Sequence, residues 1–163
     1  MQQLVSLGST RGEANFHLVF TPKYRRDVFR DGEVRRVCLE SFRQTCYALG
    51  IRVEACEFGP DHVHVFLSGC KNHSVPEMAQ RLKGASAHRI RHELWDRVRE
   101  KLWGDSLWSD GYFYRSVGST TADAVRYYVE NSQRKHWMRH DYETQGREDK
   151  EEPQREQARL DEF

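Results

Sequence analysis

Residues 59–67 place two histidines two positions apart inside an apolar run, Gly-Pro-Asp-His-Val-His-Val-Phe-Leu. Successive side chains of a strand point to opposite faces of its sheet, so His62, His64 and Phe66 are expected on one face. The leading Gly-Pro-Asp is typical of a turn, which puts the histidine pair at the start of the strand, within reach of a metal ion or substrate. A His-x-His pair also occurs on half-exposed strands without any function, so its meaning depends on the rest of the chain.

Hydrophobic periodicity predicts the elements on either side of this turn. Residues 15–21 have a strand pattern that Pro22 stops. Apolar side chains then repeat at helical spacing over residues 33–49, and Gly50 supplies a helix end. Residues 51–56 alternate as a strand. The turn should fold this strand back onto the histidine strand as an antiparallel hairpin.

The second half of the chain repeats the helix-then-strand pattern. Ser74 begins a capping box with proline in the first turn, so a helix should start there. Residues 107–117 are rich in aromatic side chains and are predicted to form the last strand. A further helix is expected from Thr120, and it would carry Tyr127 and Tyr128.

The order strand, helix, strand, strand, helix, strand predicts an α+β fold of the ferredoxin-like βαββαβ type, with an antiparallel sheet and an additional C-terminal helix. Both helices of the repeat should cover one face of the sheet. The opposite face, with the two histidines, is then left for a ligand, a partner subunit or the last helix.

Charge divides the chain into two parts. Of 26 Lys or Arg and 25 Asp or Glu, residues 141–163 hold four and nine, which leaves 22 and 16 in residues 1–140. We interpret residues 1–140 as one domain and residues 141–163 as a flexible or solvent-exposed helical tail, because the tail has almost no apolar side chains to bury. A modestly basic domain suits a polyanionic partner, although many soluble domains carry such a charge.

The cysteines and the hydropathy pattern indicate a cytoplasmic protein. The four cysteines show no CxxC spacing, so we expect reduced thiols, with Cys38 and Cys46 as small core residues on a helical stripe. No apolar run is long enough for a signal peptide or a membrane span, and we expect no membrane partner.

Basic residues form two clusters that could contact phosphates. One follows the first strand, where such a cluster is more often a solvated loop. The other lies on the helix that starts at Ser74, which we favour as the phosphate-contacting helix over the alternative of a solvated face. The candidate DNA-binding residues are Lys23, Arg25, Arg26, Arg81, Lys83 and Arg89. His88 and His92 have the spacing of a zinc pair, but no third ligand stands out nearby, so we assign no zinc site to them.

Taken together, these segments resemble the single-tyrosine HUH transposases of the smallest insertion sequences, a family that includes the REP-associated tyrosine transposases. The resemblance spans roughly the whole basic domain and rests on residues 16–26, residues 59–64, Trp108 with residues 111–113, and residues 128–131. Members of this family cut and rejoin single-stranded DNA as homodimers. The resemblance therefore implies a transposase that acts on single-stranded DNA with hairpins.

The resemblance also implies a mechanism. Two neutral imidazoles, His62 and His64, would bind Mg²⁺ or Mn²⁺ and leave positions for phosphate oxygens. A tyrosine hydroxyl would attack the phosphorus and form a 5′-phosphotyrosine. Because Tyr127 and Tyr128 lie about 100° apart around a helix, only one of them can face the metal. The family frame of tyrosine, aliphatic residue and glutamate matches Tyr128.

The position of the third metal ligand departs from the family pattern. The family places a glutamine one turn after the tyrosine, but Ser132 occupies that position here, so Gln133 is the candidate ligand and Asn131 the alternative. The resemblance implies a tyrosine helix that reaches the histidines of the other subunit. Gly118 would be its hinge, unless it only permits a tight turn before the helix.

The sequence is also compatible with three other functions. One is a domesticated relative that cuts chromosomal repeat hairpins, and another is a nucleic-acid-binding module without catalysis on the same fold. The third is a replication initiator or relaxase. Retention of both histidines and the tyrosine argues against the binding module, and the small size argues against the initiator.

Overall fold

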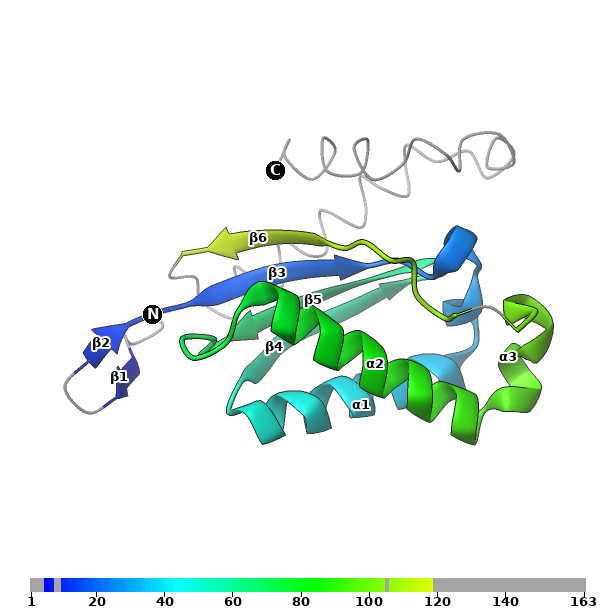
Figure 1. Cartoon of the computed structure of the whole chain (residues 1–163), viewed down its shortest axis with the longest axis horizontal. Helices are drawn as coiled ribbons and strands as arrows, with labels where there is room; N and C mark the ends of the chain where they lie inside the picture. Colours follow the sequence, from blue (N-terminus) through cyan, green and yellow to red (C-terminus); the bar gives the residue numbers. More distant parts are fainter. Residues whose placement is uncertain (1–4, 8–9, 105, 119–163) are drawn as a thin grey trace.

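The computed structural model describes residues 5–7, 10–104 and 106–118. A four-stranded antiparallel sheet has the order β4-β5-β3-β6, and α1 and α2 cover one of its faces (Figure 1). The elements of this layered unit are β3 (Asn15–Phe20), α1 (Gly32–Leu49), β4 (Arg52–Gly59), β5 (His62–Ser68), α2 (Val75–Glu93) and β6 (Phe113–Val117). The predicted βαββαβ order is therefore confirmed within the described residues.

Smaller elements are added to this plan. A two-stranded hairpin of β1 (Val5–Leu7) and β2 (Thr10–Gly12) precedes β3. Two 3₁₀ turns, η1 (Lys23–Arg25) and η2 (Val28–Arg30), connect β3 to α1, and α3 (Trp95–Leu102) follows α2. The predicted tyrosine helix and the tail, residues 141–163, lie outside the described residues. None of the described helices is long and apolar enough to cross a membrane.

The core lies between the sheet and the two long helices. Strands β3 and β5 direct apolar side chains into it at alternate positions, and the helices add Val34, Val37, Cys38, Phe42, Cys46, Met78, Leu82 and Ile90. The helix ends follow the sequence signals. Gly50 ends α1 with a left-handed φ of 72°, and the Ser74 hydroxyl caps α2 by accepting a hydrogen bond from the N–H of Glu77 at 3.2 Å.

The predicted last strand, residues 107–117, is wrong in its first half. The ladder with β3 covers Phe113–Val117, whereas Trp108 forms an isolated antiparallel bridge with Pro22 and is buried in the core beside Leu107. The ammonium of Lys83 donates hydrogen bonds to the carbonyls of Ser109, Asp110 and Gly111 at 2.6, 3.2 and 3.2 Å. These carbonyls are thereby satisfied by a side chain instead of a neighbouring strand, which a pattern of aromatic residues does not reveal.

Trp108 connects this segment to the helical layer. Its ring packs against Phe20, Phe29 and Phe42, with ring centroids 5.8, 5.5 and 6.5 Å away. Its indole N–H donates to the hydroxyl of Ser86 at 3.0 Å, and both side chains are buried. The Ser86 hydroxyl in turn donates to the carbonyl of Leu82.

We predict that Ser86→Ala lowers the free energy of unfolding by about 1–3 kcal/mol, because the buried indole N–H of Trp108 loses its acceptor. Ser116→Ala, at an exposed position of β6, is the control and should change stability by less than about 0.5 kcal/mol. Urea unfolding of both variants would measure the difference. Equal changes in the two variants would show that the hydrogen bond between Trp108 and Ser86 does not stabilise the protein.

Candidate functional site

The face of the sheet opposite α1 and α2 carries three buried histidines. Val63, Val65 and Leu67 of β5 point into the core, so His62 and His64 lie on the other face. The register of β3 against β5 pairs Val19 with His64 and His17 with Phe66, which brings His17 beside His64 on that face. Their exposed fractions are 0% for His17, 1% for His62 and 3% for His64. Buried imidazoles need hydrogen-bond partners, and those partners define the site.

His62 is fixed by a carboxylate. The Nδ1 atom of His62 lies 2.9 Å from Oδ1 of Asp61, and Arg25 donates to Oδ2 of the same carboxylate at 3.0 Å. Burial raises the pKa of Asp61, but the hydrogen bond from His62 and the charge of Arg25 outweigh it and hold that pKa well below its usual range. An ionised carboxylate can only accept, so Nδ1 carries the ring proton of His62. In the neutral ring, Nε2 then has the lone pair that binds metals.

The turn before β5 also fixes the His62 ring. Gly59 of β4 pairs with His62 of β5, and a Cβ atom on Gly59 would lie 2.1 Å from Cε1 of the imidazole. Glycine is therefore required here by the close approach of the ring. The sequence suggested a glycine for the turn, and the structure gives it this second role.

His64 is held by a third histidine that sequence analysis treated only as part of a strand. Nε2 of His17 lies 2.9 Å from Nδ1 of His64, and the two rings stack with centroids 5.1 Å apart. The His17 ring also stacks on Phe66 at 4.4 Å. Burial and then the charge of Arg115 lower the pKa of His17 to about 3, so it is neutral near pH 7. Val19 is the residue of β3 that pairs with His64, and His17 lies two residues before it on the same face. This neighbourhood cannot be predicted without the register of β3 against β5.

The two histidines of β5 can supply two nitrogen ligands to a divalent ion. Their ring centroids lie 5.1 Å apart with the planes at 87°, and Nδ1 of each ring already has a partner. No cluster of three or more His, Cys, Asp or Glu residues suited to a metal ion occurs in the described ranges. Further ligands of a metal ion bound at this pair would have to come from elsewhere. The predicted third ligand, Gln133, lies outside the described residues, as do Asn131, Tyr127 and Tyr128.

The basic cluster after β3 is partly occupied by contacts within the protein. The side chain of Arg25 is 7% exposed and paired with Asp61, and Arg26 donates to the carbonyl of Leu102 at 2.7 Å. Lys23 lies over the ring of Tyr24, with its ammonium 5.5 Å from the ring centroid. Contact of these residues with DNA stays a prediction, and for Arg25 the structure gives a second role beside His62.

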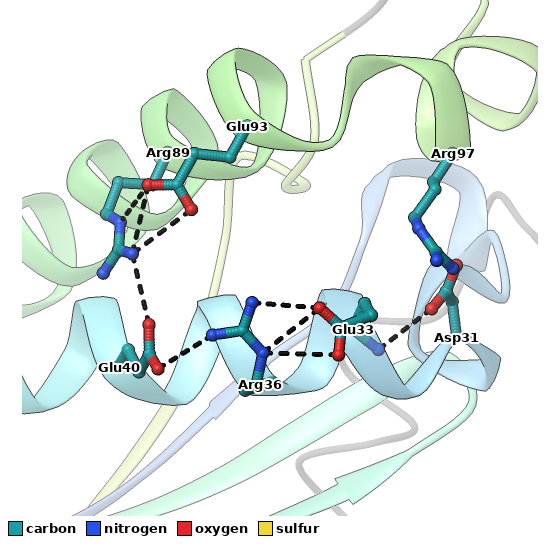
Figure 2. A network of polar contacts seen from close by, with 7 residues as sticks. All are labelled: Asp31, Glu33, Arg36, Glu40, Arg89, Glu93 and Arg97. Carbon is teal, nitrogen blue, oxygen red and sulfur yellow. Dashed lines mark hydrogen bonds and ion pairs between the residues drawn. The ribbon is translucent and has the colours of Figure 1, made fainter.

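The basic residues of α2 divide in the same way. Arg81 is exposed, whereas Lys83 is bonded to the backbone before β6. Arg89 forms ion pairs with Glu40 of α1 at 3.2 Å and with Glu93 of α2 at 3.1 Å (Figure 2). The network continues from Glu40 through Arg36 to Glu33 on α1. The positive charge of Arg89 is therefore largely balanced by glutamates of α1 and α2. Of Arg81, Lys83 and Arg89, Arg81 is therefore the residue that could contact DNA with the least loss of contacts within the protein.

The pair His88 and His92 and the residue Gly118 lie outside the cluster of buried histidines. The rings of His88 and His92 stack with centroids 6.1 Å apart on α2, away from the three buried histidines. Gly118 is exposed directly after β6, and a Cβ atom there would meet nothing within 4 Å. The hinge role of Gly118 stays a prediction, and its surroundings leave room for a larger residue.

Comparison with known proteins gives a consistent family. Residues 10–132 match the family model described as IS200-like transposase. The chain is 34% identical to the ISDra2 transposase TnpA of Deinococcus radiodurans over 119 residues, which cover 73% of this chain and 84% of that protein. It is also 34% identical to the IS200 transposase of Salmonella typhimurium over 122 residues, or 75% of this chain and 79% of that one.

Solved structures show the same fold. A crystal structure assigned as a transposase from Deinococcus radiodurans superposes with a TM-score of 0.63 and 29% identity, covering 78% of this chain and 97% of that one. A REP-associated tyrosine transposase bound to a REP hairpin superposes with a TM-score of 0.52 and 9% identity, covering 80% and 74% of the two chains. The second likeness shows a shared fold only.

We predict that Gly59→Ala lowers the free energy of unfolding by about 1–3 kcal/mol, because the new methyl group overlaps the His62 ring and must displace it. Gly84→Ala in α2 is the control, since a Cβ atom there meets nothing within 4 Å and alanine favours a helix. Urea unfolding should rank Gly59→Ala below the wild type and Gly84→Ala at or above it. A neutral Gly59→Ala would mean that the His62 ring is not held against this glycine.

Proposed function

The chain belongs to the IS200-like transposase family, and from this premise we propose that it cuts and rejoins single-stranded DNA at hairpin-marked ends of an insertion sequence. The observation that carries the proposal is the buried pair His62 and His64, each with Nδ1 bonded to a partner. Such a pair is suited to bind a metal ion beside a phosphate. A nucleic-acid-binding module would have no use for it.

The donor set fits a divalent metal ion. His62 and His64 would hold it through Nε2, with Gln133 as the proposed third ligand and Asn131 as the alternative. Mg²⁺ prefers oxygen ligands, so two imidazoles should bind it weakly, and Mn²⁺ somewhat better. When bound, the ion polarises the scissile phosphate and stabilises the charge that develops on its oxygens.

Tyr128 is the proposed nucleophile. Its hydroxyl oxygen forms a bond to phosphorus while the bond between phosphorus and the 3′ oxygen breaks, which leaves a 5′-phosphotyrosine and a free 3′-OH. The phenolic proton is lost and the departing 3′ oxygen takes up a proton, so charge balances. Attack by a 3′-OH of another strand reverses the step and joins the ends without an external energy source.

The remaining proposals concern assembly and DNA contacts. We propose hairpin contacts from Lys23, Arg25, Arg26, Arg81, Lys83 and Arg89, with the exposed Arg81 of α2 as the main contact on that helix. A homodimer with active sites shared between subunits would use Gly118 as the joint of the tyrosine helix. The exposed position of Gly118 after β6 is compatible with this role.

Sequence identity favours a mobile element over a chromosomal repeat as the substrate. Identity is 34% to both the ISDra2 transposase and the IS200 transposase. A domesticated role on chromosomal repeat hairpins is therefore the second candidate. The DNA that flanks the gene would separate the two, because element ends should be present only beside a mobile transposase.

We predict that Tyr128→Phe abolishes the covalent protein–DNA adduct, since it removes the attacking hydroxyl and keeps the ring. Tyr127→Phe is the matched control and should form the adduct at a rate close to wild type. The assay incubates each protein with labelled single-stranded element ends and Mn²⁺, then separates products on a denaturing gel. Excess EDTA should prevent the adduct in every case.

The outcomes of this assay distinguish the parts of the proposal. Adduct with Tyr128→Phe and none with Tyr127→Phe would move the nucleophile by one residue. Full activity in EDTA would contradict the role of the metal. Absence of any adduct with the wild type, at confirmed DNA binding, would favour the binding module instead.

A further inference from the structure

We infer that His17 is a positioning residue for the metal site: its Nε2 accepts a hydrogen bond from Nδ1–H of His64 and so keeps the lone pair of His64 on Nε2. The inference rests on the proposed function, because it assumes that His64 binds the metal. It starts from the 2.9 Å separation between Nε2 of His17 and Nδ1 of His64. Neither the family resemblance nor the sequence assigned a role to His17.

Two neutral imidazoles joined by one hydrogen bond have only two arrangements. If His17 donates, Nδ1 of His64 is the acceptor, and the proton of His64 must lie on Nε2. That nitrogen cannot then bind a metal ion. If His64 donates from Nδ1, its Nε2 carries the lone pair, and His17 is protonated on Nδ1. Metal binding at Nε2 of His64 therefore selects the arrangement in which His17 accepts.

The same logic operates at the neighbouring histidine with a different acceptor. Asp61 accepts from Nδ1 of His62 at 2.9 Å, so both proposed ligands have an acceptor on the ring nitrogen away from the metal. Metal-binding histidines usually have such a partner, and its loss typically costs about 10–100-fold in metal affinity. The acceptor is an anion for His62 and a neutral ring for His64.

Packing holds the His17 ring in the orientation that this role needs. β3 lies between β5 and β6, and the His17 side chain is 0% exposed. Its ring is nearly parallel to Phe66, with centroids 4.4 Å apart and planes at 9°, and it meets the edge of Phe113 at 5.9 Å and 68°. The direction of Nε2 is therefore set by rings on both neighbouring strands.

A pair of near-isosteric substitutions separates positioning from packing. Glutamine and methionine are both unbranched and similar in length, but only glutamine ends in a strong acceptor oxygen. His17→Met should weaken Mn²⁺ binding by about 10–100-fold, whereas His17→Gln should retain affinity within a few-fold of wild type. Methionine is the better core residue, so stability should rank the two variants in the opposite order.

The experiment titrates the full-length protein with Mn²⁺ and follows the EPR signal of the free ion, with thermal unfolding measured on the same samples. His88→Met, at an exposed histidine of α2, is the matched control and should bind as wild type. His64→Ala tests the proposed metal site itself and should lose binding. If His17→Met does not fold, His17→Phe takes its place, since it keeps the stacked ring and has no acceptor.

The two claims fail in different ways. Wild-type affinity in His17→Met, with binding lost in His64→Ala, would overturn the role of His17 and leave the metal site intact. Equal losses in His17→Gln and His17→Met would also overturn it, because a packing role predicts no benefit from the acceptor. Unchanged affinity in His64→Ala would contradict the proposed metal site.

Discussion

The structure depends on how two imidazoles are buried on the face of the sheet opposite the helices. Each buried ring must satisfy a nitrogen inside the protein, and both do so through Nδ1. Asp61 is the partner of His62 and His17 is the partner of His64, so the proposed metal ion would bind each ring through Nε2. The ring orientation that a metal ion would require is thus fixed by the same contacts that make burial of the rings tolerable.

The contacts that hold His62 also involve the backbone of η1, before α1. Asp61 is itself buried, and its second oxygen accepts from Arg25, whose side chain is nearly buried. Arg25 and the preceding Tyr24 have left-handed φ values of 51° and 57°, which cost non-glycine residues about 1–3 kcal/mol each. The tight turn of η1 places the side chain of Arg25 beside Asp61. A segment whose sequence suggests phosphate contacts therefore also supports the proposed metal site, through the contact of Arg25 with Asp61.

Local signals explain which features were predictable. The alternation of β5, the helix start at Ser74 and the helix end at Gly50 depend on neighbouring residues, and all three are found as predicted. The partner of His64 was missed because it depends on the register of β3 against β5. Charge patterns also failed to show that Arg89 joins α1 to α2 and that Lys83 binds carbonyls before β6, since both contacts join distant segments.

We propose that Nε2 of His62 and Nε2 of His64 face one divalent ion. A crystal structure of the protein grown with Mn²⁺, with anomalous data collected above the manganese edge, tests it most directly. We expect one anomalous peak within coordination distance of both Nε2 atoms, with Nδ1 of each ring still bonded to Asp61 or His17. A peak at Nδ1 of either ring, or no peak on this face at saturating Mn²⁺, would contradict it.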